Sequence, residues 1–367
     1  MKKVALITGD SSLSGAPKHI LRLAVNLKER GWEVLVILPP GPLVKQLDEA
    51  GISHKQIGMG NGIDRKAYHK IRRQTSIFDP DVVHCHGMRG GLLGRLAARR
   101  MKVPVIYTEH LWTKHYHLSN PAYEKAQITA QKFLDRYTTK TIAVSGAVKD
   151  FLVRKKFKSS KIVVILNGID PKFAKTELIK KPKGMPIIFG SVGSLNRQKN
   201  YIRILKAVTK IKKEHPDLMF HYQIIGEGPD RKKLVNIVKR LKLERIVHFT
   251  GRVERVEEQL KHFSFFVTAS MSESFGLAAA EALSMGLPVV ASDAGGLKDI
   301  VHEGCGFLVD PRDIDEISQA IYKLITDDKL REEMSEHARE DASKRFSESK
   351  MVDKIVTLYE KVIRNHK

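Results

Sequence analysis

The chain has 367 residues, 42% of them hydrophobic, which favours two domains with buried cores over one. Its formal net charge of +23 indicates attraction to polyanions, but no recognition motif accompanies the charge, so nucleic-acid binding is not expected. No uncharged apolar stretch approaches the ~20 residues that span a bilayer, and the short apolar run after Met1 is no signal peptide, so we expect a cytoplasmic protein.

Short apolar runs alternate with helical patterns through most of the chain, which predicts parallel sheets with crossover helices. A helix is expected at 17–30, and strands of the first half at 4–8, 33–38, 81–85, 103–108, 141–144 and 162–166. Residues 172–186, rich in lysine and proline, interrupt the alternation as a linker would. A second series predicts strands at 187–192, 220–225, 246–249, 263–269, 288–291 and 307–309, and an amphipathic helix follows from about residue 345.

The basic clusters and the two cysteines can both be interpreted without a catalytic role. Basic clusters at 65–73, 95–102, 154–161 and 175–183 are either solvated helix faces or a peripheral surface for anionic lipid on the inner face of the cell membrane. Cys85 and Cys305 show no metal or redox spacing, which favours buried small apolar residues of a reducing compartment.

The most informative segment is Ser272-Glu273-Ser274-Phe275-Gly276-Leu277-Ala278-Ala279-Ala280-Glu281. A predicted strand runs into it and a helix is expected to begin near Phe275, so unpaired backbone N–H groups offer a site for hydroxyls or phosphate. Glu273 and Glu281 are eight positions apart, which on a helix places them on nearly the same face. Such a pair could hold a sugar at one end and a ribose at the other.

This segment, followed by Gly286-Leu287-Pro288-Val289-Val290, resembles the E-x7-E signature of retaining glycosyltransferases of the GT-B fold, family 4 (glycosyl transferases group 1). The resemblance implies an α/β protein of two Rossmann-like, doubly wound parallel-sheet domains that face a central cleft. Residues 1–171 would form the acceptor-side domain, 172–186 the linker and 187–345 the donor domain, with the helix 346–367 crossing back to the first domain.

The resemblance also implies roles for residues of the E-x7-E segment. Glu281 would bind the ribose hydroxyls, and Glu273 would lie near the hydroxyls of the donor hexose. The backbone N–H groups at Phe275, Gly276 and Leu277 would contact sugar or phosphate, and Ser274 is counted with them in the donor site.

Further motifs match the family along the chain. Gly193-Ser194-Leu195-Asn196-Arg197-Gln198-Lys199-Asn200 resembles its G-R-L-x-x-x-K-G/N loop, which gives Lys199 the donor diphosphate. The family arginine falls on Ser194, and Arg197 could supply that charge from the same loop. Thr108-Glu109-His110 resembles T-x-H, whose histidine faces the donor sugar. Weaker matches place Gly15 near the phosphate, within Ser12–Pro17, and Arg252 and Val253 beside the nucleobase.

Metal ions are not expected to take part. His84 and His86 share one side of a predicted strand, but no third ligand with suitable spacing is evident, so both are interpreted as cleft-lining or structural. Asp313-Ile314-Asp315 begins a polar helix and is interpreted as a cap rather than a D-x-D motif. We therefore expect a metal-independent enzyme without cofactor.

The expected function is the transfer of a hexose from a UDP- or GDP-sugar to a hydroxyl of a glycan or lipid-linked acceptor, with anomeric retention by same-face substitution. Loops at 58–64 and 111–123 are the most individual parts of the first half, and His115, Tyr116 and His117 are candidates for acceptor contact. Two alternatives stay open: a sucrose- or trehalose-type synthase with a soluble acceptor, and a non-catalytic polyanion-binding GT-B protein, which Ser14 and Ser194 would favour.

Overall fold

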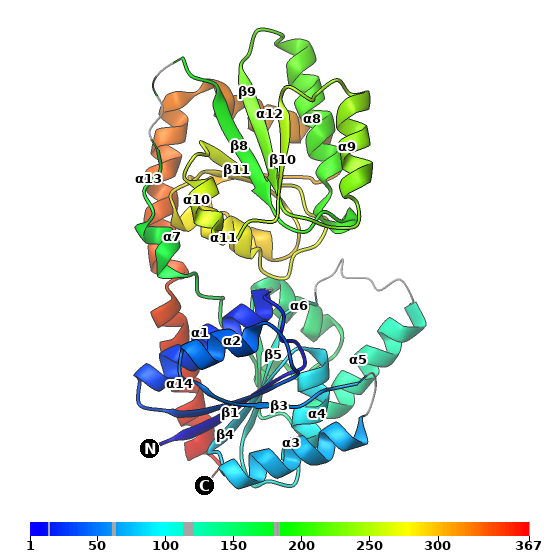
Figure 1. The fold of residues 1–367 in the computed structure, drawn as a ribbon, viewed down its shortest axis with the longest axis vertical. Helices are drawn as coiled ribbons and strands as arrows, with labels where there is room; N and C mark the ends of the chain where they lie inside the picture. Colours follow the sequence, from blue (N-terminus) through cyan, green and yellow to red (C-terminus); the bar gives the residue numbers. More distant parts are fainter. Residues whose placement is uncertain (14, 61–63, 113–120, 180–181, 183, 367) are drawn as a thin grey trace. The chain divides into compact units, whose positions relative to one another are not determined.

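The computed structural model describes residues 1–13, 15–60, 64–112, 121–179, 182 and 184–366. The chain forms two compact units. Unit 1 comprises Met1–Gly168 and Ser349–Lys367, and unit 2 comprises Ile169–Glu348. Each unit is a parallel β-sheet flanked by helices, and the last helix, α14, belongs largely to unit 1 (Figure 1).

The sheet of unit 1 has the strand order β3-β2-β1-β4-β5-β6-β7, and every pair in it is parallel. Its strands are β1 (Lys3–Thr8), β2 (Glu33–Leu38), β3 (Ser53–Gln56), β4 (Val82–His86), β5 (Val105–Glu109), β6 (Lys140–Ala143) and β7 (Ile162–Val164). The helices are α1 (Gly15–Glu29), α2 (Leu43–Glu49), α3 (Arg65–Phe78), α4 (Met88–Ala98), α5 (Pro121–Asp135), α6 (Gly146–Arg154) and α14 (Glu348–Arg364).

Two apolar cores lie on opposite faces of this sheet, because successive side chains of a strand point to opposite sides. Val4 and Leu6 of β1 pack with α1, α2 and α14. Ala5 and Ile7 pack with α3 and α4 on the other face. The strands are therefore buried on both sides, which accounts for their continuous apolar sequences.

The sheet of unit 2 has the order β10-β9-β8-β11-β12-β13 and is also parallel. Its strands are β8 (Ile187–Val192), β9 (Phe220–Ile225), β10 (Val247–Gly251), β11 (Phe265–Thr268), β12 (Val289–Ser292) and β13 (Gly306–Val309). The helices are α7 (Pro171–Lys175), α8 (Tyr201–Glu214), α9 (Arg231–Arg240), α10 (Val256–Leu260), α11 (Leu277–Ser284), α12 (Ile314–Thr326) and α13 (Asp328–Arg345). Short 3₁₀ turns occur at Ser159–Lys161 in unit 1 and at Arg197–Lys199 and Gly295–Asp299 in unit 2.

All predicted strands are present, with ends that differ by at most two residues, but the sequence did not predict β3. Its residues Ser53-His54-Lys55-Gln56 are mostly exposed at the sheet edge, so they carry no apolar run. Asp313 caps α12 as predicted, accepting hydrogen bonds from two backbone N–H groups. Cys85 and Cys305 are buried and free.

The segment predicted as a linker is partly helical. Pro171–Lys175 form α7, whose Lys172 makes an ion pair of 3.0 Å with Glu257 of α10. No helix among the described residues is long and apolar enough to cross a membrane.

The strand order reverses at one point in each sheet, between β1 and β4 in unit 1 and between β8 and β11 in unit 2. At such a point the loops after two neighbouring strands diverge to opposite faces and leave a crevice at the carboxyl ends, where doubly wound sheets bind ligands. Each unit therefore has one topologically favoured site.

Candidate functional site

In unit 2, Lys199 and Glu273 form an ion pair at the point where the strand order reverses. Lys199 comes from the loop after β8 and Glu273 from the loop after β11. The loops are also joined through Gln198, whose carbonyl accepts from the N–H of Met271 at 2.8 Å and whose side chain donates to the carbonyl of Ser272 at 2.5 Å. The Lys199 and Glu273 side chains keep 23% and 14% of their surface exposed, so a ligand can reach both.

The loop that carries Lys199 is fixed by two asparagines. The side chain of Asn196 accepts from the backbone N–H of Lys199 at 3.1 Å, which caps the 3₁₀ turn. Asn200 adopts a left-handed conformation with φ of 56°, and its amide donates to the carbonyls of Ala269 and Pro311 at 3.0 and 2.8 Å. Arg197 is exposed on the same turn. Its predicted replacement of the family arginine at Ser194 stays a prediction.

The loop that carries Glu273 is shaped by backbone contacts with two glycines. The N–H of Gly296 donates to the carbonyl of Glu273 at 2.7 Å. A Cβ on Gly295 or Gly296 would lie 2.2 or 2.4 Å from a carbonyl oxygen of this loop, so only glycine permits the approach. The pair Gly295-Gly296 therefore packs closely against the backbone of the Glu273 loop.

The predicted helical relation between the two glutamates is wrong. Helix α11 begins at Leu277, two residues after Phe275, and Gly276 precedes it with φ of 103°. Glu273 lies in the loop, while Glu281 lies in the second turn of the helix, so helical periodicity does not relate them. Ser274 is partly buried, and Phe275 is buried against Phe346, with ring centroids 5.9 Å apart.

The other predicted donor residues of unit 2 follow β8 and β10. Gly193 follows β8, where a Cβ would stand 3.1 Å from Cε of Lys199. Arg252 and Val253 follow β10, and the N–H of Gly226 donates to the carbonyl of Gly251 at 2.8 Å, which ties the loop after β9 to the end of β10.

In unit 1, three histidines meet where the strand order reverses. His86 ends β4, and His110 directly follows β5 and is 8% exposed. Nδ1 of His86 lies 3.2 Å from Nε2 of His110. The ring of His19, from α1, has its centroid 5.2 Å from that of His110 and 5.7 Å from that of His86. One ring nitrogen from each histidine lies within 4.8 Å of the other two.

The prediction that His86 has no third partner with metal-ligand spacing was wrong, because His19 and His110 come from distant parts of the chain. His84 is structural, as one of the two predicted roles had it. Its Nδ1 is 2.6 Å from the hydroxyl of Tyr359, and its Nε2 is 2.7 Å from the hydroxyl of Thr108. His84 thus connects the sheet to α14.

The three clustered histidines are held in the neutral form. Burial lowers the pKa of His19 to about 4, with a smaller contribution from the charge of Arg22. Burial also lowers the pKa of His86 and His110 well below the usual value, and neighbouring histidines add to this. The Nε2 atoms of His19 and His86 are buried and have no hydrogen-bond partner among the described residues.

Sequence reasoning did not single out Glu109, which holds the turn after His110. Its carboxylate accepts from the hydroxyl of Tyr107 and from the N–H of Leu111, each at 2.8 Å. Burial raises the pKa of Glu109. The sequence did contain a signal for Glu109, because a carboxylate stands there between an apolar strand and a histidine. Gly15 is the first residue of α1, whereas Ser14, His115, Tyr116 and His117 lie outside the described residues.

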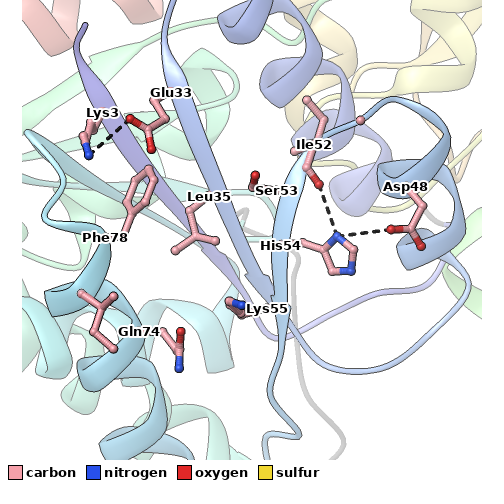
Figure 2. Close-up of a pocket in the computed structure, with 12 residues that line it drawn as sticks. Lys3, Glu33, Leu35, Asp48, Ile52, Ser53, His54, Lys55, Gln74 and Phe78 are labelled. Atoms are coloured by element: carbon pink, nitrogen blue, oxygen red, sulfur yellow. Dashed lines mark hydrogen bonds and ion pairs between the residues drawn. The ribbon is translucent and has the colours of Figure 1, made fainter.

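A separate pocket of about 580 Å³ lies at the amino ends of β1, β2 and β3 (Figure 2). Two pairs form among its lining residues: Lys3 lies 3.3 Å from Glu33, and His54 lies 3.7 Å from Asp48. The candidate residues follow the carboxyl ends of strands, so this pocket is not part of either site.

Comparison with known proteins matches both halves of the chain. The family model described as glycosyl transferases group 1 matches residues 174–341, and that described as Glycosyltransferase Family 4 matches 13–173. The chain is 31% identical to the UDP-Gal:alpha-D-GlcNAc-diphosphoundecaprenol alpha-1,3-galactosyltransferase of Escherichia coli over 97% of this chain and 96% of the relative. It is 29% identical to the D-inositol 3-phosphate glycosyltransferase of Corynebacterium jeikeium over 77% of this chain and 72% of the relative.

Solved structures match over the whole chain. Anabaena Alr3699/HepE in complex with UDP matches with a TM-score of 0.85 at 20% identity, covering 98% of this chain and all of the other. The sucrose-phosphate synthase of Thermosynechococcus elongatus matches with a TM-score of 0.84 at 18% identity, and each chain is fully covered. At these identities the similarity shows the fold.

Proposed function

Because the chain belongs to the family 4 glycosyltransferases and has the GT-B fold, we propose that it transfers a hexose from a UDP-sugar to a hydroxyl of a lipid-linked acceptor, with retention and without a metal ion. The observation that carries the proposal is the Lys199–Glu273 pair at the reversal point of the unit 2 sheet.

A UDP-sugar is the donor best supported. The E. coli relative is named for UDP-Gal, and the Anabaena protein binds UDP, whereas the sequence alone left UDP and GDP open. Charge also favours a diphosphate at this site. Departure of the nucleotide leaves negative charge on the diphosphate, and a fixed ammonium beside it lowers the barrier. In this proposal Lys199 supplies that charge, and Glu281 binds the ribose.

Glu273 and His110 would act on the sugar. Lys199 holds Glu273 at the reversal point, where its carboxylate can accept from hexose hydroxyls. The family resemblance gives His110 contact with the donor sugar, and its neutral imidazole can exchange hydrogen bonds with hydroxyls. Same-face substitution needs no protein nucleophile.

The lipid-linked acceptor is supported by charge and by the E. coli relative, which is named for a diphosphoundecaprenol substrate. Arg65, Lys66, Lys70 and Arg73 are exposed on α3, and α3 packs against α4, which ends beside exposed Arg99 and Arg100. These helices lie on the same face of the unit 1 sheet (Figure 1). Such a basic surface would be drawn to anionic headgroups by about 1 kcal/mol per basic residue near the membrane.

The test combines ligand binding with transfer. In EDTA, UDP and UDP-galactose should raise the melting temperature of the wild type more than GDP does, because they bind only the folded state. Transfer of radiolabelled galactose to a polyprenyl-diphosphate acceptor should proceed in EDTA. Stabilisation by GDP alone would overturn the donor assignment, and transfer that stops in EDTA and resumes with Mg²⁺ would overturn metal independence.

Stereochemistry and acceptor are tested separately. The anomeric proton coupling of the product should show an α-linkage from the α-linked donor, and a β-linked product would refute retention. The protein should sediment with phosphatidylglycerol vesicles at low salt and be released as salt rises, because surface charges are screened within about 10 Å at 0.1 M. Equal binding to phosphatidylcholine vesicles would exclude an electrostatic surface.

A further inference from the structure

We propose that His19, His86 and His110 form a binding site for a transition-metal ion, Zn²⁺ being the best fit, and that the ion inhibits the enzyme by binding His110. The inhibitory part rests on the proposed function, since it assumes that His110 acts on the donor sugar. The metal site itself does not.

Geometry is the first argument for the site. Tetrahedral zinc with Zn–N bonds of ~2.0–2.1 Å places its ligand nitrogens about 3.3 Å apart. Nδ1 of His86 and Nε2 of His110 are 3.2 Å apart, which suits two ligands of one ion as well as it suits a hydrogen bond. One ring nitrogen from each of the three histidines lies within 4.8 Å of the other two.

Unsatisfied donors and acceptors are the second argument. Buried polar atoms usually have a hydrogen-bond partner. The Nε2 atoms of His19 and His86 have none among the described residues, although both are buried. By contrast, both ring nitrogens of the neighbouring His84 are bonded. The two unsatisfied nitrogens therefore belong to histidines that meet at the reversal point, whereas Nδ1 of His86 would give up its hydrogen bond with Nε2 of His110 if both bound one ion.

The chemistry of the ligand set selects zinc. Three neutral imidazoles suit Zn²⁺ and Cu²⁺ better than Mg²⁺ or Ca²⁺, which prefer oxygen ligands. Three protein ligands leave the fourth position of a zinc ion to water. Neutral imidazole is the form of histidine that binds a metal.

Inhibition follows from shared atoms. A nitrogen of His110 bound to zinc cannot accept a hydrogen bond from a sugar hydroxyl, and the ion would fix the ring in one orientation. Magnesium should have no such effect. The expected behaviour is thus an enzyme that works in EDTA and is inhibited by micromolar zinc, with activity restored when a chelator is added.

The experiment measures zinc binding directly, by competition with a chromophoric chelator, using the full chain. His221 and His248 form an exposed pair with nitrogens 3.3 Å apart that could also bind zinc, so every protein carries His248→Gln. We expect one zinc per chain in this background. His19→Gln and His86→Asn should each weaken binding about 100-fold, at least as much as the loss of an outer-shell partner. Cobalt added in place of zinc should give visible absorption bands that both variants lose.

The outcomes separate the metal site from the proposed function. Absence of a tight zinc site, or equal affinity in His19→Gln and its background, would overturn the site. Circular dichroism and UDP stabilisation check that each variant is folded, and His19→Gln is the milder change because it lies partly exposed. If zinc binds through His19 and the ratio of transfer rates with and without zinc is unchanged by the variant, the inhibitory role fails. If the protein binds zinc but shows no sugar transfer when assayed in EDTA, the metal site stands and the proposed function is overturned.

Discussion

The ion pair between Lys199 and Glu273 allows a test that separates a structural role from a role in donor binding. The two roles predict different effects of substitutions on stability and on UDP affinity. Breaking a buried pair costs about 3–5 kcal/mol, and breaking an exposed pair about 0.2–1 kcal/mol. The two side chains are 23% and 14% exposed, so we expect about 1–2 kcal/mol for Lys199→Met or Glu273→Gln. That loss corresponds to a melting temperature lower by about 3–6 °C in a unit of this size. The double variant should recover part of the loss, because it leaves neither charge unpaired.

Binding of UDP should follow another pattern. A hydrogen bond to a charged group contributes about 1.5–3 kcal/mol, so Lys199→Met should raise the dissociation constant of UDP by about 10- to 100-fold. Glu273→Gln should leave UDP binding unchanged or tighter, because it frees the ammonium of Lys199 from a competing carboxylate. Titration calorimetry in EDTA measures both values.

The control is Lys210→Met, a lysine of α8 whose Nζ lies 2.5 Å from a carboxylate oxygen of Asp315 on the surface. It removes the same charge from the same unit, on the helix that follows the Lys199 turn, and should leave UDP affinity unchanged. The reasoning is refuted if Lys199→Met binds UDP as tightly as the wild type. It is also refuted if both single variants lose affinity equally and the double variant regains it, since the pair would then only hold two loops together.

Three further predictions concern the supports of the two units. Gly296→Ala would place a methyl carbon 2.4 Å from the carbonyl oxygen of Ser274, so it should lower both the melting temperature and UDP affinity, whereas Gly58→Ala, with no atom within 4 Å, should change neither. Tyr359→Phe removes a buried hydroxyl that pairs with a histidine of β4, and unfolding in urea should show a loss of about 1–3 kcal/mol. Backbone N–H groups hold the pKa of Asp64 below its usual 3.8, so its stabilising effect should be present above pH 3.8 and be lost below it. Asp64→Asn should abolish that part of the pH dependence in acid unfolding experiments.

The sequence predicted the fold well because the strands of both sheets are buried on two faces. Continuous apolar runs such as those of β1 and β8 are visible without knowledge of their neighbours. The exposed edge strand β3 has no such run, and only its pairing with β2 makes it a strand. Pairing across 18 residues is a property of the folded chain, so local patterns do not contain it.

The candidate site was predicted residue by residue, but not its geometry. Glu273 and Glu281 do not share a helical face, because Gly276 takes a left-handed conformation and the helix begins only at Leu277. The contact of Lys199 with Glu273 joins residues 74 positions apart, and no spacing rule relates them. His19 could not be predicted for the same reason. It meets His86 and His110 because α1 follows β1, and β1 lies beside β4 in the sheet.

The two units share one topology, which explains why the position of each candidate site can be predicted from the sequence but its ligand cannot. Each sheet reverses its strand order after its first strand, and each carries its candidate residues there, in the loops after β8 and β11 and near the ends of β1, β4 and β5. Topology thus fixes where a ligand binds, but the residue types decide which ligand. Unit 2 presents an ammonium paired with a carboxylate, and the ammonium is the group that would attract a diphosphate. Unit 1 presents neutral imidazoles that would gain little from a diphosphate but can bind hydroxyls or a metal ion. If the assignment were reversed, UDP would protect unit 1 from amide hydrogen exchange. We expect it to protect the Lys199 and Glu273 loops of unit 2 instead.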